Sequence, residues 1–157
     1  MVLLSIPSLF MIDGRAAVLS ARLGLTDPKD QPFFAFVAVG DGSIEFGFGA
    51  DLKMPSGSGD ILTLNAEIQA GFFFNDSSKW YVNAGTRDNP ILAKIVRIVT
   101  LKSYLMMSAK GIDAGARGEM SFKREYGPIK VAAWAYLELG GNVSFERPQF
   151  GLSLIHI

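Results

Sequence analysis

The side chains of this sequence that could do chemistry are mainly carboxylates. Glycoside hydrolysis needs only two of them at a suitable separation. Glu67 and Glu138 each lie near the middle of a stretch in which polar and apolar residues alternate, on its polar side. Such alternation is typical of a β-strand with one solvated face. Because a solvated face carries isolated carboxylates without any catalytic use, we interpret both residues as surface groups.

The residues that supply most nucleophiles, general bases and metal ligands are nearly absent. The chain has no cysteine, and its one histidine, His156, lies within the last six residues, which we interpret below as adapter-derived. The serines therefore have no histidine partner, and the nearest approach to a Ser-x-x-Lys motif, Ser121-Phe122-Lys123, lies in a predicted strand. The polar stretch from Asn75 to Ser78 offers too few ligands for calcium and is better explained as a turn. We expect no catalytic residue, no metal site and no cofactor, so the chain is not predicted to be an enzyme.

One set of side chains could bind a ligand without reacting with it. Trp134, Tyr136, Glu138 and Asn142 fall on the same side of the alternating stretch from Ile129 to Glu146. Two aromatic rings flanked by polar groups can form a platform for sugar rings or for a partner protein. The alternative, which the sequence favours, is that the two rings pack beneath a neighbouring layer.

The overall composition narrows the classes of partner and fold. Fifteen basic and fifteen acidic residues leave no net charge, so nucleic acid is not an expected partner, while a membrane stays open. A hydrophobic content of 49% excludes a disordered chain. Seventeen glycines and twelve phenylalanines favour a β protein rich in turns.

Two-residue alternation predicts the elements that hold these side chains. The longest alternation runs from Ile129 to Glu146 and predicts a half-buried strand. Shorter runs bounded by Gly, Pro, Asn and Asp turns predict further strands over residues 17–25, 33–39, 44–52, 62–72, 79–85, 103–109 and 114–123. We therefore expect a mainly β fold, an antiparallel meander of about eight to nine strands.

The segment from Ile91 to Thr100 has a different period. On a helical wheel its aliphatic residues share one arc, whereas Lys94 and Arg97 would spoil both faces of a strand. Asn89 suits a helix N-cap and Pro90 a first helical residue. Several β-branched residues argue against a helix. We predict one short helix near residues 90–100, with a strand as the alternative.

Three motifs follow one another in the middle of the chain: Trp80 to Thr86 (WYVNAGT), Asn89-Pro90-Ile91, and Tyr104 to Met107 (YLMM). Together they resemble a repeated feature of very large, β-rich bacterial proteins of uncharacterised function, and the resemblance extends to Phe145. It implies a fragment of a long, sheet-rich scaffold without an assigned activity. It also implies a strand rather than a helix from Ile91 to Val99.

The last six residues, Leu152 to Ile157, match a sequencing adapter. They can be written as the codons CTG TCT CTT ATA CAC ATC, which form the transposase mosaic end of library adapters. We therefore expect residues 1–151 to form a single, truncated β-rich segment and residues 152–157 to be adapter-derived, with an ordinary apolar strand as the alternative. Arg147 to Gly151 is then the next turn, the sheet is open-ended, and one edge of the strand from Ile129 to Glu146 is expected to lack its partner.

These observations leave three classes of function. We favour a non-enzymatic structural or interaction segment of a larger β-sheet scaffold, with the rest of the parent polypeptide as partner and a protein or a glycan as a further one. An outer-membrane β-barrel segment is the alternative, because alternating strands joined by short turns build such walls. Phe33 to Val39 and Ser103 to Met107, apolar on both sides, argue against it. The third class is a carbohydrate-binding or carbohydrate-active module. A cell-surface or secreted location is favoured, although no signal in the chain identifies the compartment.

Overall fold

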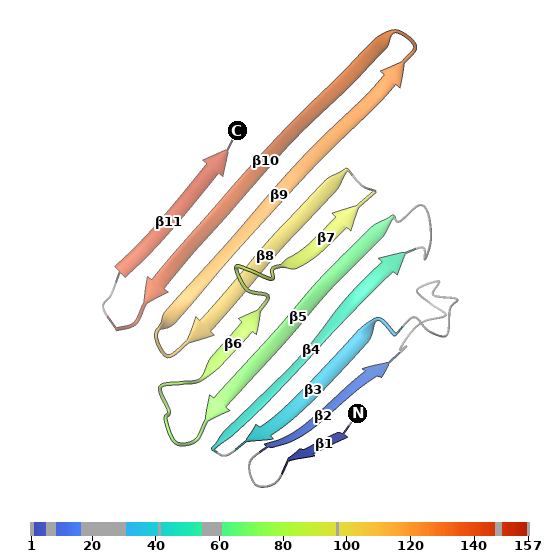
Figure 1. The fold of residues 1–157 in the computed structure, drawn as a ribbon. Coiled ribbons are helices and arrows are strands. Elements are labelled where there is room, and N and C mark those ends of the chain that lie inside the picture. Colours follow the sequence, from blue (N-terminus) through green and yellow to red (C-terminus); the bar gives the residue numbers. More distant parts are fainter. Residues whose placement is uncertain are drawn as a thin grey trace.

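The computed structural model describes residues 2–5, 9–16, 31–40, 42–54, 61–96, 98–146 and 149–156. Within these ranges the chain consists of strands and turns, and no helix long and apolar enough to cross a membrane is found. Eleven strands form one antiparallel sheet (Figure 1). They are β1 (Val2–Ser5), β2 (Leu9–Ala16), β3 (Phe33–Gly40), β4 (Ser43–Met54), β5 (Leu62–Phe73), β6 (Tyr81–Ala84), β7 (Ile91–Ile95), β8 (Val99–Ser108), β9 (Gly111–Tyr126), β10 (Ile129–Ser144) and β11 (Gln149–His156). The predicted antiparallel meander is confirmed.

The meander is interrupted once, between β5 and β8. The short strands β6 and β7 both pair with β5 and with β8, one after the other. Residues 85–90 separate them. Gly85 begins this loop with a φ of 66° and donates its N–H to the carbonyl oxygen of Glu67 at 2.8 Å. Only glycine adopts that backbone conformation readily, so Gly85 is the point where the chain leaves the sheet.

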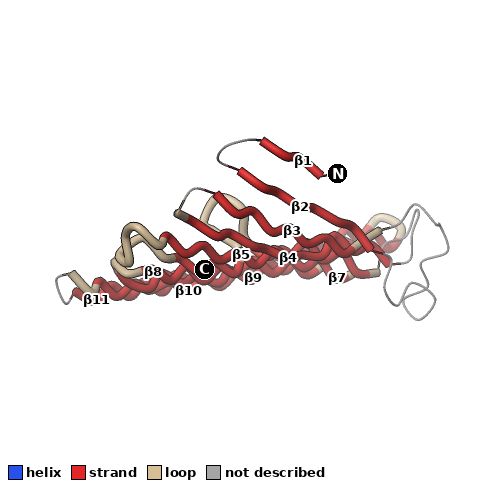
Figure 2. The backbone as a smooth tube through the Cα atoms, turned by 90° about the horizontal axis from the view of Figure 1, so that it is seen from below, coloured by secondary structure: helices blue, strands red, loops and turns tan. Residues whose placement is uncertain are grey.

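The sheet is a single layer. Figure 2 shows it along its edge, with β1 to β3 turning away from the plane of the other strands. The accessible surface is 11159 Å² for a mass of 17.0 kDa, whereas a compact monomer of that mass exposes about 7,700 Å². Among the described residues only Leu52 and Ala70 are buried hydrophobic side chains, at 6% and 5% exposure. The described part of the chain therefore encloses almost no core by itself.

The strand register gives the sheet two chemically opposite faces. Side chains alternate along a strand and direct cross-strand partners share a face, so the pairings divide the strand residues into two sets. What we call the polar face carries charged and amide side chains, among them Glu45, Asp51, Lys53, Asn65, Glu67, Gln69, Lys102, Asp113, Arg117, Glu119 and Glu138. The apolar face carries aliphatic and aromatic ones, and Arg124 is its one charged residue among the strand side chains that are described.

The predicted helix near residues 90–100 is wrong. This segment is the hairpin of β7 and β8, in which Ile95 pairs with Val99. Of the β-branched residues that argued against a helix, Ile91, Ile95 and Val99 lie in strands, where they pair across the sheet. The other two, Val96 and Ile98, lie in the turn. Val96 turns the hairpin with a φ of 50°, an uncommon conformation for a β-branched residue. The strand implied by the resemblance is found from Ile91 to Ile95.

In the 157-residue chain, half of the strand from Ile129 to Glu146 has a second partner, and five of that partner's residues, Leu152 to His156, belong to the predicted adapter. The unpaired edge expected for residues 1–151 alone therefore stays a prediction. β11 pairs with Leu137 to Ser144, and so includes residues expected to form the next turn. Ile129 to Tyr136 pair only with β9, and the end of this hairpin projects beyond the sheet (Figure 1). The strand predicted over residues 17–25 lies outside the described residues. The adapter origin of Leu152 to Ile157 stays a prediction.

Candidate binding face

The four side chains predicted to form a binding face lie on the polar face of β10. Trp134, Tyr136, Glu138 and Asn142 occupy alternate positions of this strand. The rings of Trp134 and Tyr136 stack, with centroids 6.5 Å apart and planes 13° from parallel. Trp134 is 67% exposed. Within the described chain, no second layer covers this pair, and its use in binding stays a prediction.

Arg117 on β9 joins these side chains into one network. Its guanidinium forms ion pairs with Glu119, at 2.6 Å, and with Glu138, at 3.3 Å. The same group lies 5.0 Å from the ring centroid of Tyr136, a cation–π distance. One guanidinium thus fixes the ring and a carboxylate relative to each other.

A groove of about 410 Å³ lies on the polar face beside this network. Gly115 and Gly140, direct partners on β9 and β10, contribute no side chain to its floor. Lys102, Arg117 and Glu138 are consecutive cross-strand neighbours on β8, β9 and β10, and they line the groove. Further lining comes from Asn142 of β10 and from Gly151 to Ser153 of β11. The groove therefore exists because two glycines face each other beside a row of charged residues.

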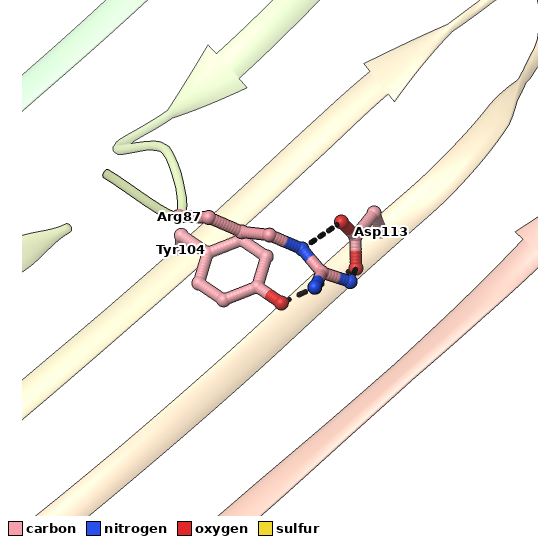
Figure 3. A network of polar contacts seen from close by, with 3 residues as sticks. All are labelled: Arg87, Tyr104 and Asp113. Atoms are coloured by element: carbon pink, nitrogen blue, oxygen red, sulfur yellow. Dashed lines mark hydrogen bonds and ion pairs between the residues drawn. The ribbon is translucent and has the colours of Figure 1, made fainter. Parts of the chain in front are cut away.

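The loop between β6 and β7 places a second arginine at the groove. Arg87 forms a bidentate ion pair with Asp113 of β9, with Nε 2.6 Å from Oδ2 and Nη2 3.0 Å from Oδ1 (Figure 3). Tyr104 of β8 donates its hydroxyl to Oδ1 of the same carboxylate at 3.2 Å. Hydrogen bonds from the Arg87 side chain hold the pKa of Asp113 below its usual value, whereas desolvation raises the pKa of Tyr104. The carboxylate and both donors are thereby held in fixed positions.

Tyrosine rings cover glycines of adjacent strands at two places on the polar face. A Cβ built on Gly115 would lie 2.5 Å from the Tyr104 ring, and one on Gly71 would lie 2.4 Å from the Tyr81 ring. Tyr81 also donates its hydroxyl to Glu45 of β4 at 2.7 Å. Desolvation, with this hydrogen bond, raises the pKa of Tyr81 to about 12. Glycine is needed at both positions because only hydrogen leaves room for the ring.

The structure does not bring the two singled-out carboxylates together. Glu67 on β5 and Glu138 on β10 lie four strand spacings apart in the sheet, which is roughly 19 Å. Glycosidase carboxylates lie within about 9.5 Å of each other, so these two cannot act on one bond.

The described residues also include no group of three or more His, Asp or Glu side chains that could hold a metal ion. The stretch from Asn75 to Ser78 is a turn, in which Asp76 accepts the N–H of Ser78 at 3.0 Å. Hydrogen bonds from Ser78 lower the pKa of Asp76. The carboxylate is used to close the turn.

Comparisons with models of known families, with curated proteins and with solved structures found no match for this chain. The site must therefore be interpreted from its geometry. Sequence reasoning missed Arg87, Lys102, Tyr104 and Arg117, because they come from a loop and two other strands. The one signal that could have found them is the register of β8 to β10, which aligns Lys102 with Arg117 and Arg117 with Glu138.

Proposed function

We propose that this chain is a non-enzymatic structural and interaction segment of a larger β-sheet scaffold, in which a second apolar layer covers its apolar face. The observation that carries the proposal is the separation of polar and apolar side chains across the sheet, in which β3, with apolar side chains on both faces, is an exception. Large hydrophobic residues stand exposed on that face from β2 to β11, among them Ile12, Val37, Phe48, Leu101, Leu137 and Leu154. Exposed apolar patches of more than a few hundred Å² mark interaction surfaces.

The size of the apolar face supports a permanent partner. Ten strand positions across the sheet, at about 4.8 Å each, and strands of mostly 8–16 residues give a face on the order of 1,500 Å². A standard protein interface uses about 800 Å² of each partner, and larger apolar interfaces are typical of obligate assemblies. The rest of the parent polypeptide is the partner that this area favours.

The polar face supports the same assignment, because it needs no covering layer. Its charges are neutralised across strands by ion pairs such as Arg117 with Glu138 and Lys130 with Glu125. Glu67 and Glu138 on this face are too far apart to act on one bond, and the described residues include no metal-binding group. We therefore assign this face to solvent and the apolar face to assembly.

Self-association of the 157-residue chain tests this proposal. The exposed apolar face predicts oligomers in sedimentation velocity and strong binding of a hydrophobic dye. Replacing Phe48 and Leu137 by Lys should reduce both, because two charges then interrupt the apolar surface. The matched control changes Thr63 and Ser121 of the polar face to Lys and should leave the oligomers unchanged. A monodisperse monomer that binds no dye would contradict the proposal.

A wall segment of an outer-membrane β-barrel is the second candidate function. The same two faces favour it, because a barrel wall presents apolar residues to lipid and polar residues to its interior. The stretch from Phe33 to Val39 no longer argues against it: Phe34 and Phe36 lie over Gly49 and Gly47 on the polar face, so the rings replace missing side chains. The two candidates differ in the layer that covers the apolar face. Lipid-soluble quenchers in liposomes would reduce fluorescence beside this face in a barrel wall and leave it unchanged in a protein-covered scaffold.

A further inference from the structure

The groove on the polar face has the dimensions of a ligand site. Its volume of about 410 Å³ falls within the range of roughly 300 to 1,000 Å³ found for small-molecule pockets. A second hollow of about 230 Å³ is lined by Trp134, Tyr136 and Glu119. Arg117 lines both hollows. The polar face therefore offers two adjoining subsites that share one guanidinium.

The charges at these subsites balance. Arg87, Lys102 and Arg117 supply three positive charges, and their neighbours Asp113, Glu119 and Glu138 supply three negative ones. A phosphate or an acidic chain would gain from Lys102 but would be repelled by Glu138. An uncharged ligand with many hydroxyl groups suits this lining better, because each hydroxyl can accept from an ammonium or guanidinium and donate to a carboxylate.

The aromatic rings provide the apolar contacts that sugar recognition needs in addition to hydrogen bonds. A pyranose ring has hydroxyls around its rim and C–H groups on its faces, and those faces pack against aromatic rings. Trp134 is largely exposed and is held by its stack with Tyr136. Tyr104, over Gly115, lines the other hollow. Each subsite therefore has an aromatic side chain together with charged donors and acceptors.

A folded protein partner fits this face less well than a glycan does. The centres of protein interfaces are depleted of charged residues, whereas four charged side chains, those of Arg87, Lys102, Arg117 and Glu138, line the groove here. The apolar face has the composition that a protein partner requires. We propose that the polar face of β8 to β10 binds a neutral polysaccharide, with one sugar unit over Gly140 and beside the Tyr104 ring, and a neighbouring unit against Trp134.

A glycan array of neutral and acidic oligosaccharides, followed by calorimetry with cellohexaose, maltohexaose and xylohexaose, tests this proposal. The 157-residue chain is kept in solution with an amphipathic polymer, which coats the apolar face and leaves the polar face open. At least one neutral oligosaccharide should bind, and added salt should change its affinity little because the subsites carry no net charge.

Two substitutions should weaken that binding by about tenfold or more. Trp134→Ala removes a stacking surface, and Gly140→Val fills the floor of the groove. Their controls are Phe74→Ala, another exposed aromatic residue, and Gly14→Val, where a new Cβ meets nothing within 4 Å. Circular dichroism of each variant separates lost binding from lost folding.

Each other outcome would overturn the proposal. These are binding of acidic glycans only, binding of peptides without any oligosaccharide, equal effects of the control substitutions, or no binding to the array by the folded chain. None of them bears on the assembly of the apolar face, so this proposal can fail while the proposed function stands.

Discussion

The two faces of this sheet differ in the contacts that stabilise them. On the polar face, side chains from three or four strands contact each other: Arg87 reaches Asp113 from a loop, and Tyr81 reaches Glu45 across Gly71. On the apolar face, large residues such as Phe48 and Leu101 remain exposed. The polar face is held together by contacts among the described side chains, whereas the described residues leave the apolar face uncovered, and we propose that a further layer covers it.

The largest effect on stability is expected at Leu52, a buried residue of the apolar face. Leu52→Ala should lower the free energy of unfolding by about 2–4 kcal/mol, since it leaves a cavity at a buried position. Its neighbour Lys53 lies on the polar face and is exposed, so Lys53→Ala should change it by less than about 0.5 kcal/mol. Urea denaturation of both variants measures the contrast. Equal losses would mean that the two faces do not differ at this position.

A somewhat smaller effect should distinguish two glycines of β9. Gly115→Ala should cost about 1–3 kcal/mol, because the methyl group meets the Tyr104 ring and must displace it. Gly118 lies on the apolar face, where a Cβ would touch Leu101 at 3.4 Å. Gly118→Ala should therefore be neutral or slightly stabilising. If Gly115→Ala is as stable as the wild-type chain by thermal denaturation, the tyrosine-over-glycine packing does not hold the polar face together.

Alkaline pH should weaken the polar face specifically. The folded pKa of Tyr81 is about 12, above its ordinary value of 10.0. A raised folded pKa means that this stabilisation is fully present below pH 10 and is lost as the pH rises from 10 to about 12. Stability measured against pH should fall over that interval, and the fall should be smaller in Tyr81→Phe. If ultraviolet titration of the wild-type chain showed no tyrosine with a midpoint near 12 that is missing from Tyr81→Phe, this assignment would be contradicted.

The smallest effect on stability is expected at Val96, in the turn between β7 and β8. Val96→Gly should raise the free energy of unfolding by about 0.5–1 kcal/mol, because glycine relieves the left-handed conformation. Val99 begins β8 beside it, and Val99→Gly should lower stability by a similar amount or more. A loss of stability in both variants would show that Val96 is not strained.

The sequence predicted the faces of the sheet better than its connections. Alternation along the stretch from Ile129 to Glu146 placed Trp134 and Glu138 on one side, which the register confirms. The alternation within one strand is the same whichever residues of the next strand it pairs with. It therefore could not show that Arg117 opposes Glu138. The helical spacing of Ile91 to Val99 arose because aliphatic residues occupy β7, the turn that follows it and the first position of β8. Local periodicity cannot distinguish a short strand followed by a turn from a short helix.

The absence of cysteine from the chain permits a direct measurement of the central claim, that the apolar face is covered and the polar face is open in the parent polypeptide. Ala132 and Ala133 are adjacent on β10 and face opposite sides of the sheet. Single Ala132→Cys and Ala133→Cys variants of the parent polypeptide would be treated with a membrane-impermeant maleimide, before and after denaturation. We predict rapid labelling of Cys at position 132 and labelling at position 133 only after denaturation. Equal labelling of both positions in the native protein would contradict the account.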